Sequence, residues 1–387
     1  MTYLILGAGM QGRAVIYGLR RLDPEATIIV GDLDTEAAQS FVERIGVPAP
    51  MFVQLDASDS TEVMKWMEKA DVVLDLLPIA FTEKMAELAV AAGTHLVNTF
   101  YPGSIAELHE KARRQGVAIL PEMGMDPGID LVMARRLLGE FDEVTEFYSY
   151  GAGIPEREAC DNILNYKISW IWSGVLDSYI RPAHMIADGR EVSLEPEEVF
   201  QAENLHAVTL PGLGELEAIP NGNALAYVDV LGLDRGTLKS MGRYSLRWPG
   251  HAAHVLTWHR LGFLEKAVNP TLGISPFDFM VKHFEPRLQY KENERDLGIV
   301  VVKAVGIKDG KTVTITDVLI DRRDLDTGLY AMNRMVGFTA AIAARMIAEG
   351  DITARGILSP ARDVPVGLFL EALAGFGMEI ERTIDYN

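Results

Sequence analysis

The chain has 387 residues, of which 48% are hydrophobic, and its formal net charge is −19. Because phosphate recognition relies on Lys and Arg, this charge disfavours nucleic-acid binding. No apolar run reaches the roughly 18 residues that cross a bilayer, so we expect no membrane span, and we also expect no secretory signal. The single cysteine, Cys160, excludes an internal disulfide framework and a multi-cysteine zinc site. We therefore expect a cytoplasmic protein with no nucleic-acid or membrane partner.

Residues 1–124 alternate short apolar runs with segments of helical periodicity. We expect strands at 3–7, 27–31, 50–54, 72–76, 95–98 and 118–120, and helices at 11–22, 35–45, 61–68, 82–92 and 105–115. Strands separated by helical segments of about 10–15 residues indicate a parallel sheet with right-handed crossovers. The pattern predicts an α/β fold whose first domain is a doubly wound Rossmann sheet.

The rhythm changes over residues 125–327. We expect strands at 144–150, 166–170, 185–194 and 243–248, and a hairpin at Asp309-Gly310 that joins 298–306 to 312–321. These segments predict a second, α+β domain with a mostly antiparallel sheet. Residues 328–387 are expected to form helices that return to the Rossmann domain, beginning with a methionine-rich helix over 328–348.

A glycine-rich loop follows the first expected strand. Gly7, Gly9 and Gly12 fit the G-x-G-x-x-G spacing, with a strand before them and a helix after them. The first glycine allows a tight turn, the second lets the backbone approach a pyrophosphate, and the third lets the helix lie on the strand. The amide groups at Met10 and Gln11 would then face the anion. FAD and S-adenosylmethionine proteins share this loop and are the alternatives.

Asp32 ends the second expected strand, about twenty residues after the loop, where a carboxylate binds the ribose 2′-hydroxyl. Since it would repel a 2′-phosphate, we expect NAD as the cofactor, with NADP as the alternative. Asp56 and Ala57 follow the third strand, near the expected adenine, while Leu77 and Pro78 follow the fourth, near the nicotinamide ribose.

The whole chain resembles the saccharopine dehydrogenase-like family, and within it the lysine 6-dehydrogenase branch. The matching stretches follow the family's order along the chain, at residues 7–12, 122–130, 166–170, 179–182, 246–251 and 336–341. This resemblance implies a Rossmann domain, a substrate domain that also mediates dimer formation, and hydride transfer between NAD(P) and the carbon of a C–N bond. In the lysine branch that carbon is the ε-carbon of lysine.

Two departures from the family pattern concern the substrate. The family has an arginine-containing triplet directly after the segment at 166–170, and here those positions are Ile171, Trp172 and Ser173. A cationic partner for a carboxylate is therefore missing, which argues against saccharopine with its several carboxylates. Gly151 stands where saccharopine reductases tend to carry a cysteine.

Three residues are candidates for handling protons during the reaction. Asp126 follows the last Rossmann strand and could hold a substrate ammonium. Lys167 could act as a base if burial lowers its pKa, and His251 could move protons near neutral pH. For each, a structural role is the alternative: a turn and helix cap, an exposed lysine, or a hydrogen-bonded histidine.

Five further residues are candidates for contacting the substrate. Arg247 could grip an α-carboxylate through two hydrogen bonds, although a structural ion pair is equally compatible with the sequence. The family match places Tyr101 at a substrate-contacting position, and Glu122 could serve the same end as Asp126. Tyr166 and Ser169 complete the set, and no grouping of residues suggests a metal site.

The sequence thus predicts an NAD-preferring dehydrogenase that acts on the amine of a small amino acid or diamine, with L-lysine as the leading substrate and a homodimer as the assembly. A saccharopine dehydrogenase-type enzyme that makes or splits a secondary amine is the first alternative. A non-catalytic NAD(H)-binding regulatory protein is the alternative from another class.

Overall fold

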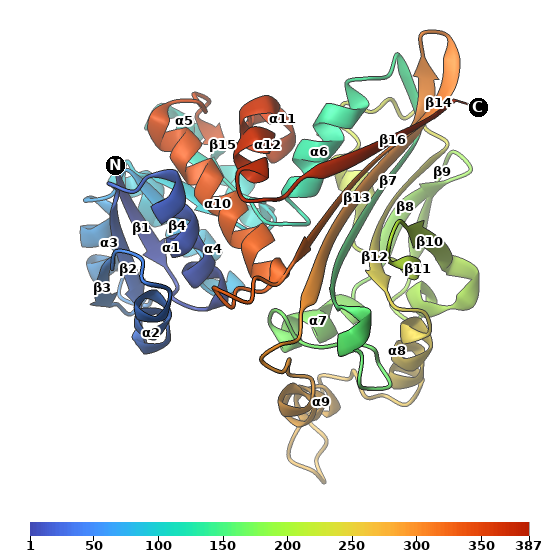
Figure 1. Cartoon of the computed structure of the whole chain (residues 1–387), viewed down its shortest axis with the longest axis horizontal. Coiled ribbons are helices and arrows are strands. Elements are labelled where there is room, and N and C mark those ends of the chain that lie inside the picture. Colours follow the sequence, from blue (N-terminus) through green and yellow to red (C-terminus); the bar gives the residue numbers. More distant parts are fainter. Residues whose placement is uncertain (387) are drawn as a thin grey trace. The chain divides into compact units, whose positions relative to one another are not determined.

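The computed structural model describes residues 1–386, and the chain divides into two compact units (Figure 1). The first unit consists of residues 1–135, 326–329 and 333–379. The second consists of residues 136–325, 330–332 and the segment that follows residue 379. Each unit therefore contains pieces of chain that are far apart in the sequence.

A parallel sheet of seven strands, in the order β15-β6-β5-β4-β1-β2-β3, forms the centre of the first unit. Its strands are β1 (Thr2–Leu6), β2 (Thr27–Asp32), β3 (Met51–Gln54), β4 (Val72–Asp75), β5 (His95–Asn98), β6 (Ala118–Leu120) and β15 (Gly356–Ile357). The order runs outward from β1 in both directions, which is the doubly wound arrangement. The Rossmann fold predicted for this part of the chain is confirmed.

Helices cover both faces of this sheet. One face is covered by α3 (Ser60–Met67), α4 (Thr82–Ala92) and α5 (His109–Arg114), whose apolar side chains share a buried cluster with Leu4 and Leu6 of β1. The other face carries α1 (Met10–Leu22), α2 (Glu36–Ile45) and α10 (Ala331–Glu349). A Cβ on Gly337 of α10 would lie 2.5 Å from the Cβ of Ala14, so these two helices are in close contact. The remaining helices are α6 (Ile129–Leu138), α11 (Pro360–Asp363) and α12 (Val366–Ala374).

The second unit is built on a sheet of nine strands that are antiparallel except where β7 pairs with β12. Seven strands follow the order β10-β11-β12-β7-β13-β14-β16, while β8 pairs with β12 and β9. The strands are β7 (Glu143–Pro155), β8 (Ala183–Ala187), β9 (Arg190–Leu194), β10 (His206–Leu210), β11 (Gly214–Pro220), β12 (Ser240–Arg247), β13 (Asp296–Lys308), β14 (Lys311–Arg322) and β16 (Ile380–Tyr386). The α-helices that lie wholly within the described part of this unit include α7 (Trp172–Tyr179), α8 (His251–Arg260) and α9 (Pro276–Phe284). The predicted mostly antiparallel second sheet is confirmed.

In the second unit, two segments adopt a structure other than the one expected, and in the first unit β15 is a strand where helices were expected. Residues 166–170 form no strand, because consecutive residues Tyr166, Lys167, Ile168 and Ser169 are all buried instead of alternating between two faces. The side chain of Asn162 holds this irregular segment by donating to the carbonyl of Tyr166 over 2.8 Å. The other difference is β16, since we expected the end of the chain to be helical.

β16 is fixed by a buried ion-pair cluster. The carboxylate of Asp317 on β14 is fully buried and accepts two hydrogen bonds from the guanidinium of Arg382 on β16, over 2.6 and 2.7 Å. Arg136 donates to the same carboxylate over 3.1 Å. A bidentate Arg–carboxylate pair forms only in a specific geometry. The pair between Arg382 and Asp317 therefore attracts β16 to β14 and also fixes the register of the two strands.

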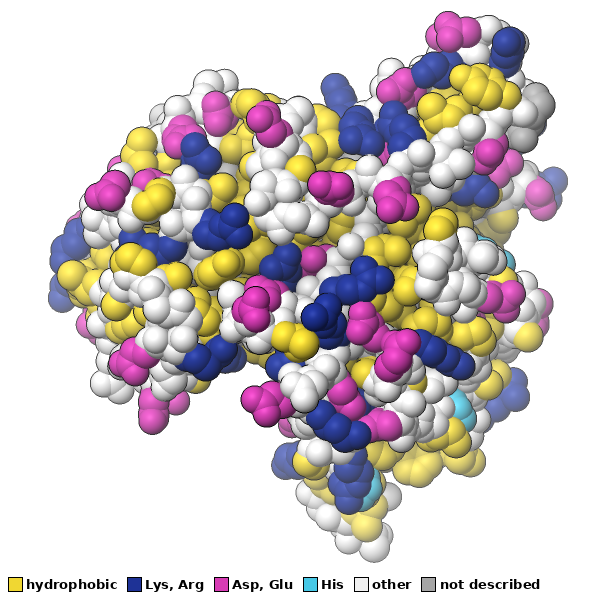
Figure 2. Space-filling model, viewed as in Figure 1, with side chains coloured by type: hydrophobic (Ala, Val, Ile, Leu, Met, Phe, Trp, Pro, Cys, Tyr) yellow, Lys and Arg dark blue, Asp and Glu magenta, His cyan; other side chains and the backbone are white. Residues whose placement is uncertain are grey.

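Acidic side chains are spread over the visible face of the molecule and form no single large patch there (Figure 2). Among residues 1–386, no helix has both the length and the apolar character needed to cross a bilayer.

Two buried polar side chains lie on neighbouring strands at the carboxyl edge of the first unit's sheet. Asp75 on β4 and Asn98 on β5 are paired in register, and both are fully buried. Oδ1 of Asp75 accepts a hydrogen bond from the amide of Leu77 over 3.2 Å, and Oδ1 of Asn98 accepts one from the amide of Phe100 over 3.1 Å. Oδ2 of Asp75 and Nδ2 of Asn98 have no hydrogen-bond partner in the described chain.

Burial raises the pKa of Asp75 to about 7, with the hydrogen bond from Leu77 opposing the shift. The folded state therefore holds a proton on Asp75 over a pH range in which the unfolded chain has lost it. Since the folded state binds more protons there, its stability falls as the pH rises from about 4 through about 7.

We expect Asp75→Asn to remove this pH-dependent loss, because a neutral amide of similar shape needs no proton to be buried. The free energy of unfolding of the variant minus that of the parent should increase as the pH rises, by up to about 4 kcal/mol at pH 8. Urea unfolding at several pH values measures the difference. Glu87→Gln, which neutralises an exposed carboxylate on α4, is the control and should not change the slope. A constant difference from pH 5 to pH 8 would contradict the assignment.

Candidate functional site

The glycine loop of the first unit is shaped by two close approaches that only glycine allows. Gly7 has φ +105°, and a Cβ on Gly12 would lie 2.1 Å from the carbonyl oxygen of Gly7. By contrast, a Cβ on Gly9 would meet nothing within 4 Å, and Gly9 is exposed. Gly7 and Gly12 are therefore required by the fold, whereas the bare backbone at Gly9 faces open space.

The amino terminus of α1 begins beside this open position. Gly9 is the N-cap residue of α1, no side chain caps the helix there, and its first turn contains no acidic residue. The amides at Met10, Gln11 and Gly12 have no partner within the helix, because the first helical hydrogen bond runs from the amide of Arg13 to the carbonyl of Gly9. With the partial positive charge of the helix terminus, these amides suit a phosphate. The residues present fit a dinucleotide.

Asp32 ends β2 and is tied to the glycine loop. Its Oδ2 accepts a hydrogen bond from the amide of Ala8 over 2.6 Å, and its Oδ1 accepts one from the amide of Asp34 over 3.1 Å. The carboxylate thus holds the loop in place as well as standing where the sequence predicts a ribose contact.

The other predicted cofactor residues follow β3 and β4, at the same carboxyl edge of the sheet. Asp56 is exposed, and hydrogen bonds with Ser58 lower its pKa. Lys84 of α4 donates to the carbonyl of Ala57 over 3.2 Å, which fixes the loop after β3. Leu77 and Pro78 directly follow the buried Asp75, and the Leu77 amide is bonded to that carboxyl. The first unit thus brings all the predicted cofactor residues to one edge.

Tyr101, Glu122 and Asp126 also belong to the first unit, after β5 and β6. Tyr101 is 44% exposed, Glu122 is buried, and Asp126 is half-buried and forms a cis peptide bond with Pro127. Glu122 has φ +62°, a conformation that non-glycine residues rarely adopt and that is common near functional sites. The carboxylate that caps the turn before α6 is that of Asp130, which accepts from the amide of Gly128 over 2.8 Å.

Lys167, in the second unit, is buried and held by two carboxylates. Its Nζ lies 2.6 Å from Glu294 Oε2 and 3.0 Å from Asp161 Oδ2. Lys291 also binds Asp161, over 2.9 Å. These ion pairs tie the segment at 166–170 to Asp161 and to Glu294.

His251, at the start of α8, has both ring nitrogens engaged. Nδ1 lies 3.0 Å from the carbonyl of Leu164, which can only accept, so Nδ1 carries the proton. Nε2 lies 2.8 Å from the hydroxyl of Tyr179, which donates to it. Burial, together with the charge of Arg247, lowers the pKa of His251 to about 3. The imidazole is thus neutral across the physiological range and does not titrate near pH 7 as the sequence suggested.

Arg247 ends β12 and is a buried cation without a carboxylate partner in the described chain. The side chain is 7% exposed, its Nη1 donates to the carbonyl of Leu246 over 2.8 Å, and its guanidinium lies 5.5 Å from the ring centre of Tyr166. Its Nε has no partner. The residue directly opposite on β11 is Glu217, but that carboxylate accepts from the amides of Gly250 and Ala252 at the start of α8.

A buried guanidinium that lacks a counter-charge is costly, and an anionic ligand would lower that cost. The cavity beside Arg247 is small, about 10 Å³, and is lined by Ser178, Tyr179, Phe200, Ile219, Pro220, Asn221, Ser245 and Arg247. That volume suffices for about one water molecule. A carboxylate is larger than this cavity, so its binding to Arg247 would require neighbouring side chains to move.

The positions that depart from the family pattern lie in different surroundings. Ile171 is 62% exposed, whereas Trp172 is buried at the start of α7 and donates from Nε1 to the carbonyl of Met280 over 3.4 Å. Ser169 is fully buried, and its hydroxyl lies 3.4 Å from where a Cβ on Gly153 would be. Gly151 lies inside β7, between β12 and β13. No cationic side chain replaces the family's arginine at positions 171–173.

Sequence reasoning missed several groups that shape these sites. Asp75 was assigned only to a strand, although its position before Leu77 could have marked it. Tyr179 was noted only as part of a family stretch, and its bond to His251 joins residues 72 apart in the sequence. Glu294 carries no motif at all and is found only through its contact with Lys167. Among residues 1–386, no group of His, Cys, Asp or Glu is arranged to hold a metal ion.

Comparisons with known proteins agree along the whole chain. Residues 3–120 match the saccharopine dehydrogenase NADP binding domain, and residues 124–378 match the saccharopine dehydrogenase C-terminal domain. The NADP(+), L-glutamate-forming saccharopine dehydrogenase of Schizosaccharomyces pombe is 26% identical, and the match covers 99% of both chains. The α-aminoadipic semialdehyde synthase of Arabidopsis thaliana is 26% identical over 91% of this chain, which spans 40% of that longer protein.

A solved structure shares the fold. Apo saccharopine dehydrogenase (L-Glu forming) from Saccharomyces cerevisiae superposes with a TM-score of 0.88, at 22% identity and with 99% of both chains covered. The resemblance noted in the sequence is thus confirmed at the level of the family. With both domain families matched in order, the chain belongs to the saccharopine dehydrogenase family.

Proposed function

We propose that this protein is an NAD-preferring dehydrogenase that oxidises the amine carbon of a small amino acid or diamine, with L-lysine as the leading substrate. The reaction removes hydride from the ε-carbon of lysine and a proton from its nitrogen, which leaves an imine. Addition of water then releases ammonia and 2-aminoadipate 6-semialdehyde. The supporting observation is that Arg247 is buried and forms no ion pair with a carboxylate in the described chain.

The residues that we propose to bind the cofactor all belong to the first unit. The open backbone at Gly9 and the amides at the start of α1 would hold the pyrophosphate, and Asp32 would accept hydrogen bonds from the adenosine ribose. When bound, the nicotinamide supplies the hydride acceptor. The Leu77 amide, fixed by Asp75, positions the loop where the nicotinamide ribose is expected.

The substrate must lose a proton before hydride can leave its carbon. A lysine-like ammonium has a pKa of about 10.4 in water, so a nearby group has to stabilise or accept the proton. Asp126 is our proposed partner for the nitrogen, supported by Tyr101 and by the strained Glu122. Lys167 and His251 then act through position: Lys167 orders the segment at 166–170, and His251 holds Tyr179 beside Arg247.

Lysine is favoured over saccharopine by the count of carboxylates. Lysine has one carboxylate, which Arg247 could grip, whereas saccharopine has three and needs further cations. Positions 171–173 offer none, since Ile171 is exposed and Trp172 is buried in the core.

The alternative is a saccharopine dehydrogenase-type enzyme that makes or splits a secondary amine. It is favoured by the names of the relatives, several of which are NADP(+)-linked and L-glutamate-forming. The cytoplasmic location and the homodimer are also part of the proposal. The first rests on the presence of only one cysteine, and the second on the family resemblance.

A panel of amines with both cofactors tests the proposal. The purified chain with NAD and L-lysine should produce reduced nicotinamide, followed by its absorbance, and NADP should be used less efficiently. The same assay in reverse, with lysine or glutamate as the amine, semialdehyde or 2-oxoglutarate as the carbonyl compound and reduced cofactor, tests the alternative. Turnover in that direction alone would replace our proposal by the saccharopine type. Binding of NAD without turnover of any amine would instead support the alternative of a non-catalytic NAD(H)-binding regulatory protein.

Asp32 should set the cofactor preference. Asp32→Ala removes the ribose acceptor and the repulsion of a 2′-phosphate, so NAD affinity should fall about tenfold, a typical cost of one lost charged hydrogen bond, with a smaller loss for NADP. Calorimetric titration of both cofactors measures this. Asp32→Asn keeps an acceptor for the Ala8 amide and separates the effect of charge from that of loop geometry. An unchanged NAD/NADP ratio in both variants would remove Asp32 from the proposal.

Arg247→Lys should raise KM for L-lysine about tenfold or more, because a lysine cannot form the paired hydrogen bonds of a guanidinium. Pentane-1,5-diamine lacks the carboxylate, so its KM should change little in the same variant. Arg243→Lys makes the same substitution at another buried arginine on β12 and is the matched control. Equal losses with both substrates would assign Arg247 a structural role.

A further inference from the structure

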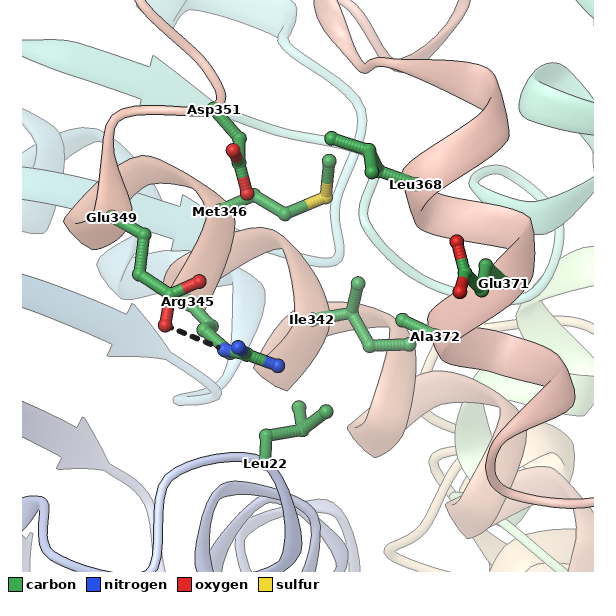
Figure 3. Close-up of a pocket in the computed structure, with 9 residues that line it drawn as sticks. All are labelled: Leu22, Ile342, Arg345, Met346, Glu349, Asp351, Leu368, Glu371 and Ala372. Carbon is green, nitrogen blue, oxygen red and sulfur yellow. Dashed lines mark hydrogen bonds and ion pairs between the residues drawn. The ribbon is translucent and has the colours of Figure 1, made fainter.

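The first unit contains a pocket of about 300 Å³ that lies apart from the dinucleotide loop. It is formed by the end of α1, the second half of α10, the turn after α10, and α12 (Figure 3). The lining residues are Leu22, Ile342, Arg345, Met346, Glu349, Asp351, Leu368, Glu371 and Ala372. Leu22 is the last residue of α1 and Gly9 precedes its first, so a helix of 13 residues, about 20 Å long, separates this pocket from the loop.

The lining combines an apolar surface with charges. Ile342 and Met346 of α10 are buried, and Leu368 of α12 is 49% exposed. Together with Leu22 and Ala372, these side chains offer a ligand a hydrocarbon surface. A ligand with an aliphatic part would remove this surface from water.

The charges of the pocket are mostly negative. Glu349, Asp351 and Glu371 come from α10, the following turn and α12, so they surround the apolar surface from different elements (Figure 3). The one cation of the lining, Arg345, is already paired, since its Nε donates to Oε1 of Glu349 over 2.8 Å. The lining therefore has an excess of two negative charges at neutral pH.

A buried hydroxyl lies near the same pair. Tyr3 of β1 is fully buried, and its hydroxyl has no hydrogen-bond partner in the described chain. Burial raises the pKa of Tyr3, and the nearby charges that affect it include Glu349 and Arg345. Strand alternation places Tyr3 on the same face as Ile5, which lies against α1. Tyr3 does not line the pocket, so the polar groups that a ligand could contact there are those of Arg345, Glu349, Asp351 and Glu371.

We propose that this pocket binds a small organic ammonium, an aliphatic amine whose chain lies on Ile342, Met346 and Leu368 while its charged end lies among the three carboxylates. A bare metal ion fits less well, because none of the carboxylates in residues 1–386 is grouped closely enough to hold one. An anion is opposed by the charge excess. The binding is independent of the substrate site, and its existence does not depend on which amine the enzyme oxidises.

Titration with hexan-1-amine, at a pH where it is protonated, tests the proposal on the full chain. Methionine methyl groups labelled with ¹³C report on the pocket directly, because Met346 lines it, and the Met346→Leu variant assigns the resonance. We expect the Met346 resonance to shift in a saturable way, with hexan-1-ol binding at least threefold more weakly and hexanoate producing no saturable shift. Equal affinities for the amine and the alcohol would overturn the role of charge.

Two variants locate the binding. Glu371→Gln removes one carboxylate and should weaken hexan-1-amine about threefold, the size expected for one exposed charge pair. Ala372→Met fills the pocket with a flexible apolar side chain and should abolish the saturable shift. Glu87→Gln neutralises an exposed carboxylate on α4 and should leave the affinity unchanged. Unaltered affinity in both pocket variants, or no saturable shift of Met346 in the parent, would overturn the proposal.

Discussion

The close approach of Gly12 to the carbonyl of Gly7 determines where the first amides of α1 lie, and therefore where the first unit can bind an anion. A side chain at position 12 would overlap that oxygen, so only glycine lets α1 start directly against the end of β1. This contact leaves the first amides of α1 beside the exposed Gly9, with neither a capping side chain nor an acidic residue in the first turn. The helix terminus therefore keeps its hydrogen-bonding capacity for an anion. The loops after β2, β3 and β4 begin at the same carboxyl edge of the sheet as the glycine loop after β1.

Asp32 has two roles, since it stabilises the glycine loop and stands where the choice between NAD and NADP would be made. Its carboxylate holds the Ala8 amide, so the group that would select between ribose and ribose phosphate also stabilises the shape of the glycine loop. A change of cofactor preference by substitution at this position must therefore preserve an acceptor for that amide. The relatives described as NADP(+)-dependent share the family, but a carboxylate at the end of β2 is the feature of this chain that bears on its own preference.

The parts of the fold that follow from local pattern were predictable, and those that depend on distant partners were not. The alternation of apolar runs and helical segments gave the Rossmann strands to within a few residues, since each βαβ unit is local. The Tyr166 segment misled because its aromatic residues suggest a strand, whereas burial on all sides and the bond from Asn162 make it irregular. β16 could not be foreseen, because it depends on pairing with β14 and on the contact of Arg382 with Asp317, 65 residues away.

The candidate site shows the same division between residue type and surroundings. Sequence reasoning identified Lys167, His251 and Arg247 as titratable or charged groups, but their chemistry depends on neighbours with no motif. Glu294 and Asp161 form ion pairs with the buried Lys167, and burial beside Arg247 keeps His251 neutral. Arg247 differs from both, because Glu217, its neighbour across the strands, is committed to the amides of α8. Because the carboxylate opposite Arg247 is used elsewhere in the fold, a substrate carboxylate could pair with this guanidinium, which is why the proposed specificity rests on Arg247 and not on the histidine or the lysine.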